Sequence, residues 1–222
     1  MSLATVQRKL AEGLASWLTY EFHCMRGDLF SEKALALPIG NILAASFKER
    51  ISAEYVHPIL KDDHRRGRRP QLDYVVEKDG KIVCAVESKW TTTSTIAWRD
   101  IMWDLIRLEM MSYQFECSCL MVLAGFGKNI DKLVPGTLTA NHTKVLFGRT
   151  KLLPSKVDLR VSTHLDEYEE ELTRYSKVRF PTCVVVQNPH VYPKSGNNMS
   201  FKVLVWKVRS QKTADRFQRD YT

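Results

Sequence analysis

Long apolar runs are missing from this sequence. No stretch approaches the roughly 18 apolar residues that a membrane-spanning helix needs, and no signal-peptide pattern opens the chain. Internal repeats and low-complexity tracts are missing as well. These absences argue against membrane, secreted and repeat proteins, and we expect a globular, cytoplasmic protein.

Cysteine is also scarce. The five cysteines are an odd number, and none has the spacing of a zinc site, which indicates a reducing compartment. Cys84 and Cys119 fall in apolar runs and are predicted to be core residues. Cys117 and Cys119 should point the same way on a strand, but they lack the partner cysteines or histidines of a zinc site.

The chain does have enough apolar material for one core, and a clear excess of positive charge. With 222 residues, 44% of them hydrophobic, we expect a single domain over residues 1–222. The formal net charge is +8 at pH 7. Such a charge favours an anionic partner, and nucleic acid is the obvious class.

The densest basic run lies between residues 61 and 69. Its arginines are predicted to contact nucleic-acid phosphates; they are Arg65, Arg66, Arg68 and Arg69. The alternative is an ordinary solvated loop, because Asp62 and Asp63 flank the arginines.

A β-hairpin follows directly. Residues 72–76 and 82–86 are rich in Val and Ile and flank an Asp79-Gly80 turn. On the second strand Glu87 and Lys89 must share a face, because strand side chains alternate. Asp73 lies on that face if the numbers of residues paired across the hairpin sum to an even value. A three-residue loop with a left-handed Gly80 would give this register. A two-residue turn would instead place Asp73 opposite Val86 and aim it away.

If they converge, these groups can do metal chemistry. Asp73 and Glu87 carry hard oxygen ligands suited to Mg²⁺ or Mn²⁺, ions that take few protein carboxylates and keep waters and phosphate oxygens. Lys89 would position the attacking water and counter phosphate charge. The alternative makes Asp73 a strand-edge charge and Glu87 with Lys89 a solvated pair.

Over residues 31–125 the sequence resembles the PD-(D/E)xK nuclease superfamily. The resemblance implies an α/β, restriction-endonuclease-like fold, a mixed β-sheet core flanked by helices, with residues 126–222 as a C-terminal α/β extension. It matches Asp73, Glu87 and Lys89 to catalytic positions, and Glu32 to the acid of a leading helix. The implied strands lie at 54–58 and 119–124, and the implied helix at 96–113.

The match is incomplete in two places. Leu72 precedes Asp73, so the proline of the family motif is absent. Pro38 and Gly40 should interrupt the helix that follows Glu32. Glu21 or Glu49 would be an alternative source of the first acid.

The resemblance implies a Mg²⁺-dependent endonuclease acting on DNA, with a homodimer as one assembly, since two strands must be cut. Trp98 and Trp103 would stack on bases or pack in the core. A second possibility is a catalytically inactive module that binds nucleic acid or a protein. A third is a basic structural protein, which predicts a salt bridge or solvent at Lys89 with Asp73 on the opposite face.

The C-terminal part is predicted from weaker signals. We expect helices at 127–133 and 165–175, and strands at 181–186 and 201–208 around a loop that contains Pro189. The basic stretch 207–219 is expected to be a frayed end, with contact to nucleic acid as the alternative.

Overall fold

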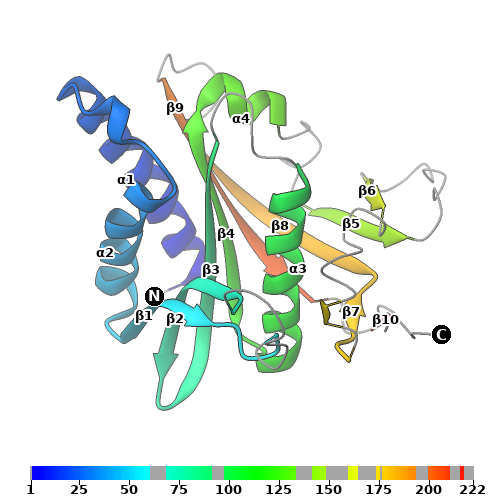
Figure 1. The fold of residues 1–222 in the computed structure, drawn as a ribbon. Coiled ribbons are helices and arrows are strands. Elements are labelled where there is room, and N and C mark those ends of the chain that lie inside the picture. Colours follow the sequence, from blue (N-terminus) through cyan, green and yellow to red (C-terminus); the bar gives the residue numbers. More distant parts are fainter. Residues whose placement is uncertain are drawn as a thin grey trace.

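The structure is a computed structural model, and it describes residues 2–60, 69–91, 98–133, 142–148, 160–164, 174–175, 177–193, 200–210 and 216–217. These residues form a mixed β-sheet with helices on both faces (Figure 1). The α/β class expected from the sequence is confirmed at this level.

The described helices are α1 (Leu3–His23), α2 (Ala36–Phe47), α3 (Trp98–Phe115) and α4 (Gly127–Leu133), with short 3-10 turns at Gly27–Leu29 and Lys33–Leu35. The strands are β1 (Arg50–Val56), β2 (Gln71–Lys78), β3 (Lys81–Thr91), β4 (Ser118–Phe126), β5 (His142–Gly148), β6 (Arg160–His164), β7 (Phe180–Pro181), β8 (Cys183–Tyr192), β9 (Phe201–Arg209) and β10 (Arg216–Phe217).

Eight of these strands form one sheet in the order β1-β2-β3-β4-β9-β8-β5-β6. Two neighbouring pairs, β3 with β4 and β5 with β6, are parallel, and the other five are antiparallel. The helix α3 connects the parallel strands β3 and β4, as parallel neighbours require a crossover. Strand β9, from the C-terminal part of the chain, lies directly beside β4. The expected extension therefore continues the same sheet.

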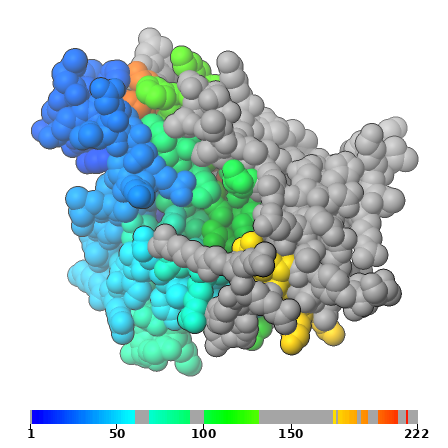
Figure 2. Space-filling view, viewed as in Figure 1, coloured from blue at the N-terminus to red at the C-terminus, as the bar shows by residue number. Residues whose placement is uncertain are grey.

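Each face of the sheet has its own hydrophobic core. Helices α1 and α2 cover one face, and α3 and α4 cover the other (Figure 1). The buried residues of α1 recur every three or four positions, the spacing of one helix face: Val6, Leu10, Ala11, Leu14, Ala15 and Leu18. In the space-filling view the first two helices form the blue surface, and the tip of the β2-β3 hairpin projects below it (Figure 2).

The hairpin carries a β-bulge that decides which way Asp73 faces. Lys78 pairs with Lys81, so Asp79 and Gly80 form a two-residue turn with φ of 50° and 72°. The register then shifts, because Val76 pairs with Cys84 while Glu77 pairs with Ile82. Val83 is the extra residue of the bulge. The expected three-residue loop was wrong.

The even register was nevertheless right. Beyond the bulge, Tyr74 pairs with Val86, and the ladder ends there. Asp73 is not paired in it, and its carboxylate contacts the backbone N–H and the hydroxyl of Ser88. Burial is the main cause of the raised pKa of the Glu87 carboxyl, and Asp73 lies close enough to Glu87 for its charge to raise that pKa further.

Most other predicted elements are present with shifted ends. The strand expected at 54–58 is β1, the helix expected at 96–113 is α3, and the strand expected at 119–124 is β4. The helix at 127–133 and the strand at 201–208 are present as α4 and β9. The strand expected at 181–186 is largely β8, which continues to Tyr192 with a register shift between Gln187 and His190. The expected loop therefore does not include Pro189, and the rest of it lies mostly outside the described residues.

Two further expectations were wrong. Pro38 and Gly40 do not interrupt a helix, since α2 includes both. Pro38 lies in the first turn, where a missing N–H costs no intrahelical hydrogen bond. The stretch after residue 207 is not simply frayed: β9 runs to Arg209, and Arg216 donates two hydrogen bonds to Glu109 of α3, at 2.7 and 2.9 Å. The helix expected at 165–175 lies almost entirely outside the described residues.

The predicted core positions of Cys84 and Cys119 and the common direction of Cys117 and Cys119 are confirmed. Cys84 and Cys119 are fully buried, and the Cys117 and Cys119 sulfurs are 3.6 Å apart. Within the described part of the chain, no helix is long and apolar enough to cross a membrane.

Candidate active site

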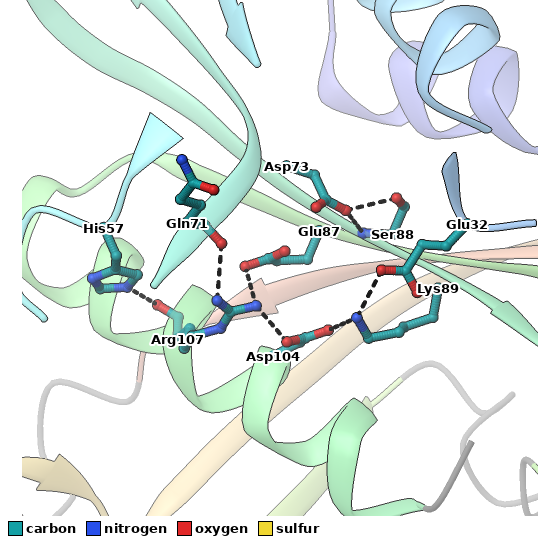
Figure 3. A network of polar contacts seen from close by, with 9 residues as sticks. All are labelled: Glu32, His57, Gln71, Asp73, Glu87, Ser88, Lys89, Asp104 and Arg107. Carbon is teal, nitrogen blue, oxygen red and sulfur yellow. Dashed lines mark hydrogen bonds and ion pairs between the residues drawn. The ribbon is translucent and has the colours of Figure 1, made fainter. Parts of the chain in front are cut away.

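Asp73 lies near the start of β2, where the pairing with β3 ends. Its side chain is half-buried, and its Oδ2 accepts hydrogen bonds from the backbone N–H and the hydroxyl of Ser88, both at 2.7 Å. Two donors on one oxygen fix the orientation of the carboxylate. In Figure 3 the other oxygen, Oδ1, has no contact with the residues drawn.

Glu87, on the neighbouring strand β3, is buried, with 1% of its surface exposed. Its Oε1 lies 2.8 Å from Nη2 of Arg107 on α3. Burial raises the pKa of the Glu87 carboxyl well above its usual range, and the Arg107 guanidinium acts in the opposite direction. The short ion pair favours the ionised carboxylate.

Arg107 is held from several sides. Its Nη2 also contacts Oδ1 of Asp104, one helical turn earlier on α3, at 2.5 Å. Its Nη1 donates a hydrogen bond to the backbone oxygen of Gln71 on β2, at 2.9 Å. This buried guanidinium therefore ties α3 to both strands of the hairpin (Figure 3).

Lys89 shares the face of Glu87 and extends the network. Its Nζ lies 3.1 Å from Asp104 Oδ2 and 3.2 Å from Glu32 Oε1. Burial lowers the pKa of Lys89, but the Asp104 and Glu32 carboxylates outweigh burial and leave that pKa raised. Lys89 is therefore an ammonium at neutral pH and does not act as a base.

Glu32 reaches the site from the segment before α2, on the other face of the sheet from α3. It precedes the 3-10 turn at Lys33–Leu35 and lies outside α2, so its expected place on a leading helix was wrong. Ser31 accepts a hydrogen bond from the Ala34 backbone N–H and orders this turn. Burial raises the pKa of Glu32, while Lys89 acts to lower it. The alternatives Glu21 and Glu49 pair elsewhere, with Arg26 and Lys78.

His57 contacts the backbone of Arg107. It is fully buried, its Nδ1 accepts hydrogen bonds from the Ile59 and Leu60 backbone N–H groups, and its Nε2 lies 3.3 Å from the Arg107 carbonyl oxygen. Because Nδ1 accepts, the ring proton is on Nε2 and is donated to Arg107. Burial lowers the pKa of His57 to about 3, so it is neutral.

The structure thus brings together four of the predicted residues, Asp73, Glu87, Lys89 and Glu32 (Figure 3). Of the predicted nucleic-acid contacts, Arg69 is exposed just before β2, and Arg65, Arg66 and Arg68 lie outside the described residues. Trp103 packs against the core, with its ring 6.0 Å from that of Phe180.

Asp104 and Arg107 were not predicted as site residues. The available signal was their position among the apolar residues of a helix that packs on the sheet. Charged residues at such positions are rarely buried without partners.

The site offers few carboxylates to a divalent cation. The described residues contain no cluster of three or more His, Cys, Asp or Glu side chains arranged around a metal position. Mg²⁺, however, needs only one or two protein carboxylates. Glu87 Oε1 is buried and faces the Arg107 guanidinium at 2.8 Å. An ion held by Asp73 and Glu87 would therefore have to bind the other Glu87 oxygen, Oε2.

Comparisons with known proteins add no assignment. No protein-family model matches the chain, and no significant match is found among curated proteins or solved structures.

Proposed function

We propose that this protein hydrolyses phosphodiester bonds, in DNA, with Mg²⁺ or Mn²⁺ held by Asp73 and Glu87, on a restriction-endonuclease-like fold. The observation that carries the proposal is the gathering of Asp73, Glu87 and Lys89 at one end of the β2-β3 hairpin, where Asp73 is close enough to add to the effect of burial in raising the pKa of the Glu87 carboxyl (Figure 3). The arrangement of β1 to β4 with α3 between β3 and β4 supports the fold.

Each side chain has a role that follows from its surroundings. A bound divalent ion would polarise the phosphodiester and make the attacking water more acidic. Asp73 is oriented for such an ion by Ser88. Lys89, a permanent cation, would stabilise negative charge on the phosphate and orient the water. Glu32 and Asp104 hold the Lys89 ammonium in place.

The test is cleavage of supercoiled plasmid and of single-stranded DNA with Mg²⁺ or Mn²⁺. Wild type is compared with Lys89→Ala, and Lys78→Ala is the matched control, since Lys78 also pairs with a glutamate but sits at the far end of the hairpin. We expect chelator-sensitive nicking that is lost in Lys89→Ala and kept in Lys78→Ala. Equal nicking by all three proteins would point to a contaminant and reject the assignment.

A catalytically inactive binding module on the same fold is the second candidate. The ion pair between Arg107 and Glu87 favours it, because that carboxylate already has a positive partner. This candidate predicts no cleavage, and DNA binding that is equal with metal and with chelator. Loss of binding in Arg69→Ala would support a DNA contact at the basic run before β2.

A homodimer is a natural assembly for a double-strand nuclease. Sedimentation of the free protein and of its DNA complex tests this proposal. A dimer that appears with DNA would support paired cuts, and a monomer in both conditions would support nicking of one strand.

A further inference from the structure

Two cysteines lie at the junction between α3 and β4. Glu116 follows the helix in the left-handed conformation, with φ of 51°, and β4 begins at Ser118. Cys117 and Cys119 lie on either side of Ser118, and both belong to the hydrophobic core between the sheet and α3. The turn out of the helix therefore brings two thiols to one place.

The two sulfurs are in direct contact. They are 3.6 Å apart, which leaves no room for another atom between them. The Cys117 thiol also lies 3.6 Å from the carbonyl oxygen of Met111, in the last turns of α3. A disulfide has a sulfur–sulfur distance of about 2.05 Å, so the gap that remains to be closed is short.

The two thiols differ in access and in acidity. Cys117 is 7% exposed and directly follows the exposed residues 113–116, whereas Cys119 is 0% exposed. The hydrogen bond from Cys119 lowers the pKa of the Cys117 thiol, while burial raises the pKa of Cys119. Because the thiolate is the reactive form of cysteine, a small oxidant should react with Cys117 first.

Cys84 offers a comparison within the same chain. It is fully buried, like Cys119, but it lies in the core on the opposite face of the sheet. Its sulfur contacts the Ala85 carbonyl oxygen at 3.9 Å, and burial raises its pKa. Cys84 should therefore be inert under conditions in which Cys117 reacts.

We propose that Cys117 and Cys119 are a modification site, which hydroperoxides oxidise to a disulfide and which thiols reduce again. The inference does not depend on the proposed function. In a reducing compartment such disulfides are usually transient and redox-sensing.

The chemistry takes two steps. First, the Cys117 thiolate attacks one peroxide oxygen, the O–O bond breaks, and the hydroxide released takes up a proton to become water, which leaves Cys117 as a sulfenic acid. Then the Cys119 sulfur attacks the Cys117 sulfur, the S–O bond breaks, and hydroxide leaves with the Cys119 proton as a second water. The two thiols together lose two electrons, which reduce one hydroperoxide.

The test is mass spectrometry of the whole protein after treatment with hydrogen peroxide. Free thiols are alkylated in denaturant, and the protein is digested with trypsin. The tryptic peptide of residues 108–128 contains Cys117 and Cys119 and no other cysteine. We expect this peptide to lose two hydrogen atoms and to take up no alkyl group, while Cys84 is still alkylated. Dithiothreitol should restore both thiols.

Two variants separate the roles of the cysteines. Cys119→Ala keeps the reacting thiol but removes its partner, so Cys117 should stop at the sulfenic acid, which dimedone traps. Cys117→Ala should leave Cys119 reduced. The result for wild type stands even if neither variant folds.

The exposed Cys24 of wild type shows that the peroxide is active. If Cys117 and Cys119 are still alkylated when Cys24 is oxidised, or if Cys117 is oxidised no faster than Cys84, the inference is overturned. Oxidation of Cys117 beyond the sulfenic acid without any disulfide would also overturn it. None of these results bears on the nuclease proposal, which is tested by DNA cleavage.

Discussion

The Asp73 carboxylate takes the place of a backbone partner for Ser88. Tyr74 and Val86 are the last residues paired between β2 and β3 at this end, and beyond them Asp73 Oδ2 accepts both the backbone N–H and the hydroxyl of Ser88. At this end of the β2-β3 ladder, a side chain thereby takes the place of a backbone acceptor. The same two bonds aim Asp73, so that hairpin stability and site geometry depend on one contact.

Ser88→Ala is the direct test of this contact. The variant loses the hydroxyl donor but keeps the backbone N–H, so we expect the free energy of unfolding to fall by about 1–3 kcal/mol. Under the proposed function, Mn²⁺ affinity should fall by about 10-fold or more, since a partner that orients a ligand is lost. Ser52→Ala on β1 is the control. Unchanged Mn²⁺ affinity in Ser88→Ala would show that Asp73 orientation is irrelevant to the metal.

The buried pair of Arg107 and Glu87 should respond unequally to removal of its two members. Arg107→Met leaves buried Glu87 without its cation and leaves Asp104 with Lys89 alone, and we expect a loss of about 3–5 kcal/mol in metal-free buffer. Glu87→Gln leaves Arg107 paired with Asp104, so its loss should be much smaller.

Urea unfolding measures both changes. Arg50→Ala provides the surface comparison, because the exposed Arg50 pairs with Glu77 at 3.7 Å, a contact worth less than about 1 kcal/mol. Equal losses for Arg107→Met and Glu87→Gln would mean that Asp104 does not share the charge of Arg107.

Local signals explain why much of the hairpin was predictable. Its strands, its Asp79-Gly80 turn and the shared face of Glu87 and Lys89 follow from short-range rules. The bulge at Val83 does not, because no local signal marks the extra residue, which shows only in the pairing of β2 with β3. The place of Asp73 relative to Glu87 was therefore open until the tertiary structure was known.

Elements outside the resemblance were harder to predict. Helix α1 was not predicted, although Val6, Leu10, Leu14 and Leu18 recur at helical spacing and Ser2 caps its first turn. Asp104 and Arg107 belong to α3, the helix implied at 96–113, and no local pattern assigns them a role in the site. Their partners on β2 and β3 are distant in sequence, so only tertiary structure reveals the network.

Gly125 on β4 is predicted to be intolerant of any side chain. A Cβ there would overlap the Thr91 hydroxyl and lie 2.7 Å from the Thr91 carbonyl oxygen, which belongs to the backbone of β3. We expect Gly125→Ala to lower the free energy of unfolding by about 1–3 kcal/mol. Gly40→Ala is the contrast, since its Cβ would meet Tyr74 at an ordinary 3.6 Å and α2 should gain up to about 1 kcal/mol. A harmless Gly125→Ala would mean that the two strands can separate at this point.

His57 should make the protein sensitive to acid. Its pKa is about 3 in the folded protein, against 6.5 in an unfolded chain, because burial disfavours the charged ring. Between these values the unfolded chain binds a proton that the folded protein does not. The contribution of His57 to stability is therefore complete above about pH 6.5 and is lost toward pH 3, by up to about 1.4 kcal/mol per pH unit.

Urea unfolding at several pH values should show this slope in wild type and in the exposed control His23→Gln, and a shallower slope in His57→Gln. Parallel pH profiles for wild type and His57→Gln would place the acid sensitivity elsewhere, in the carboxylates around Arg107.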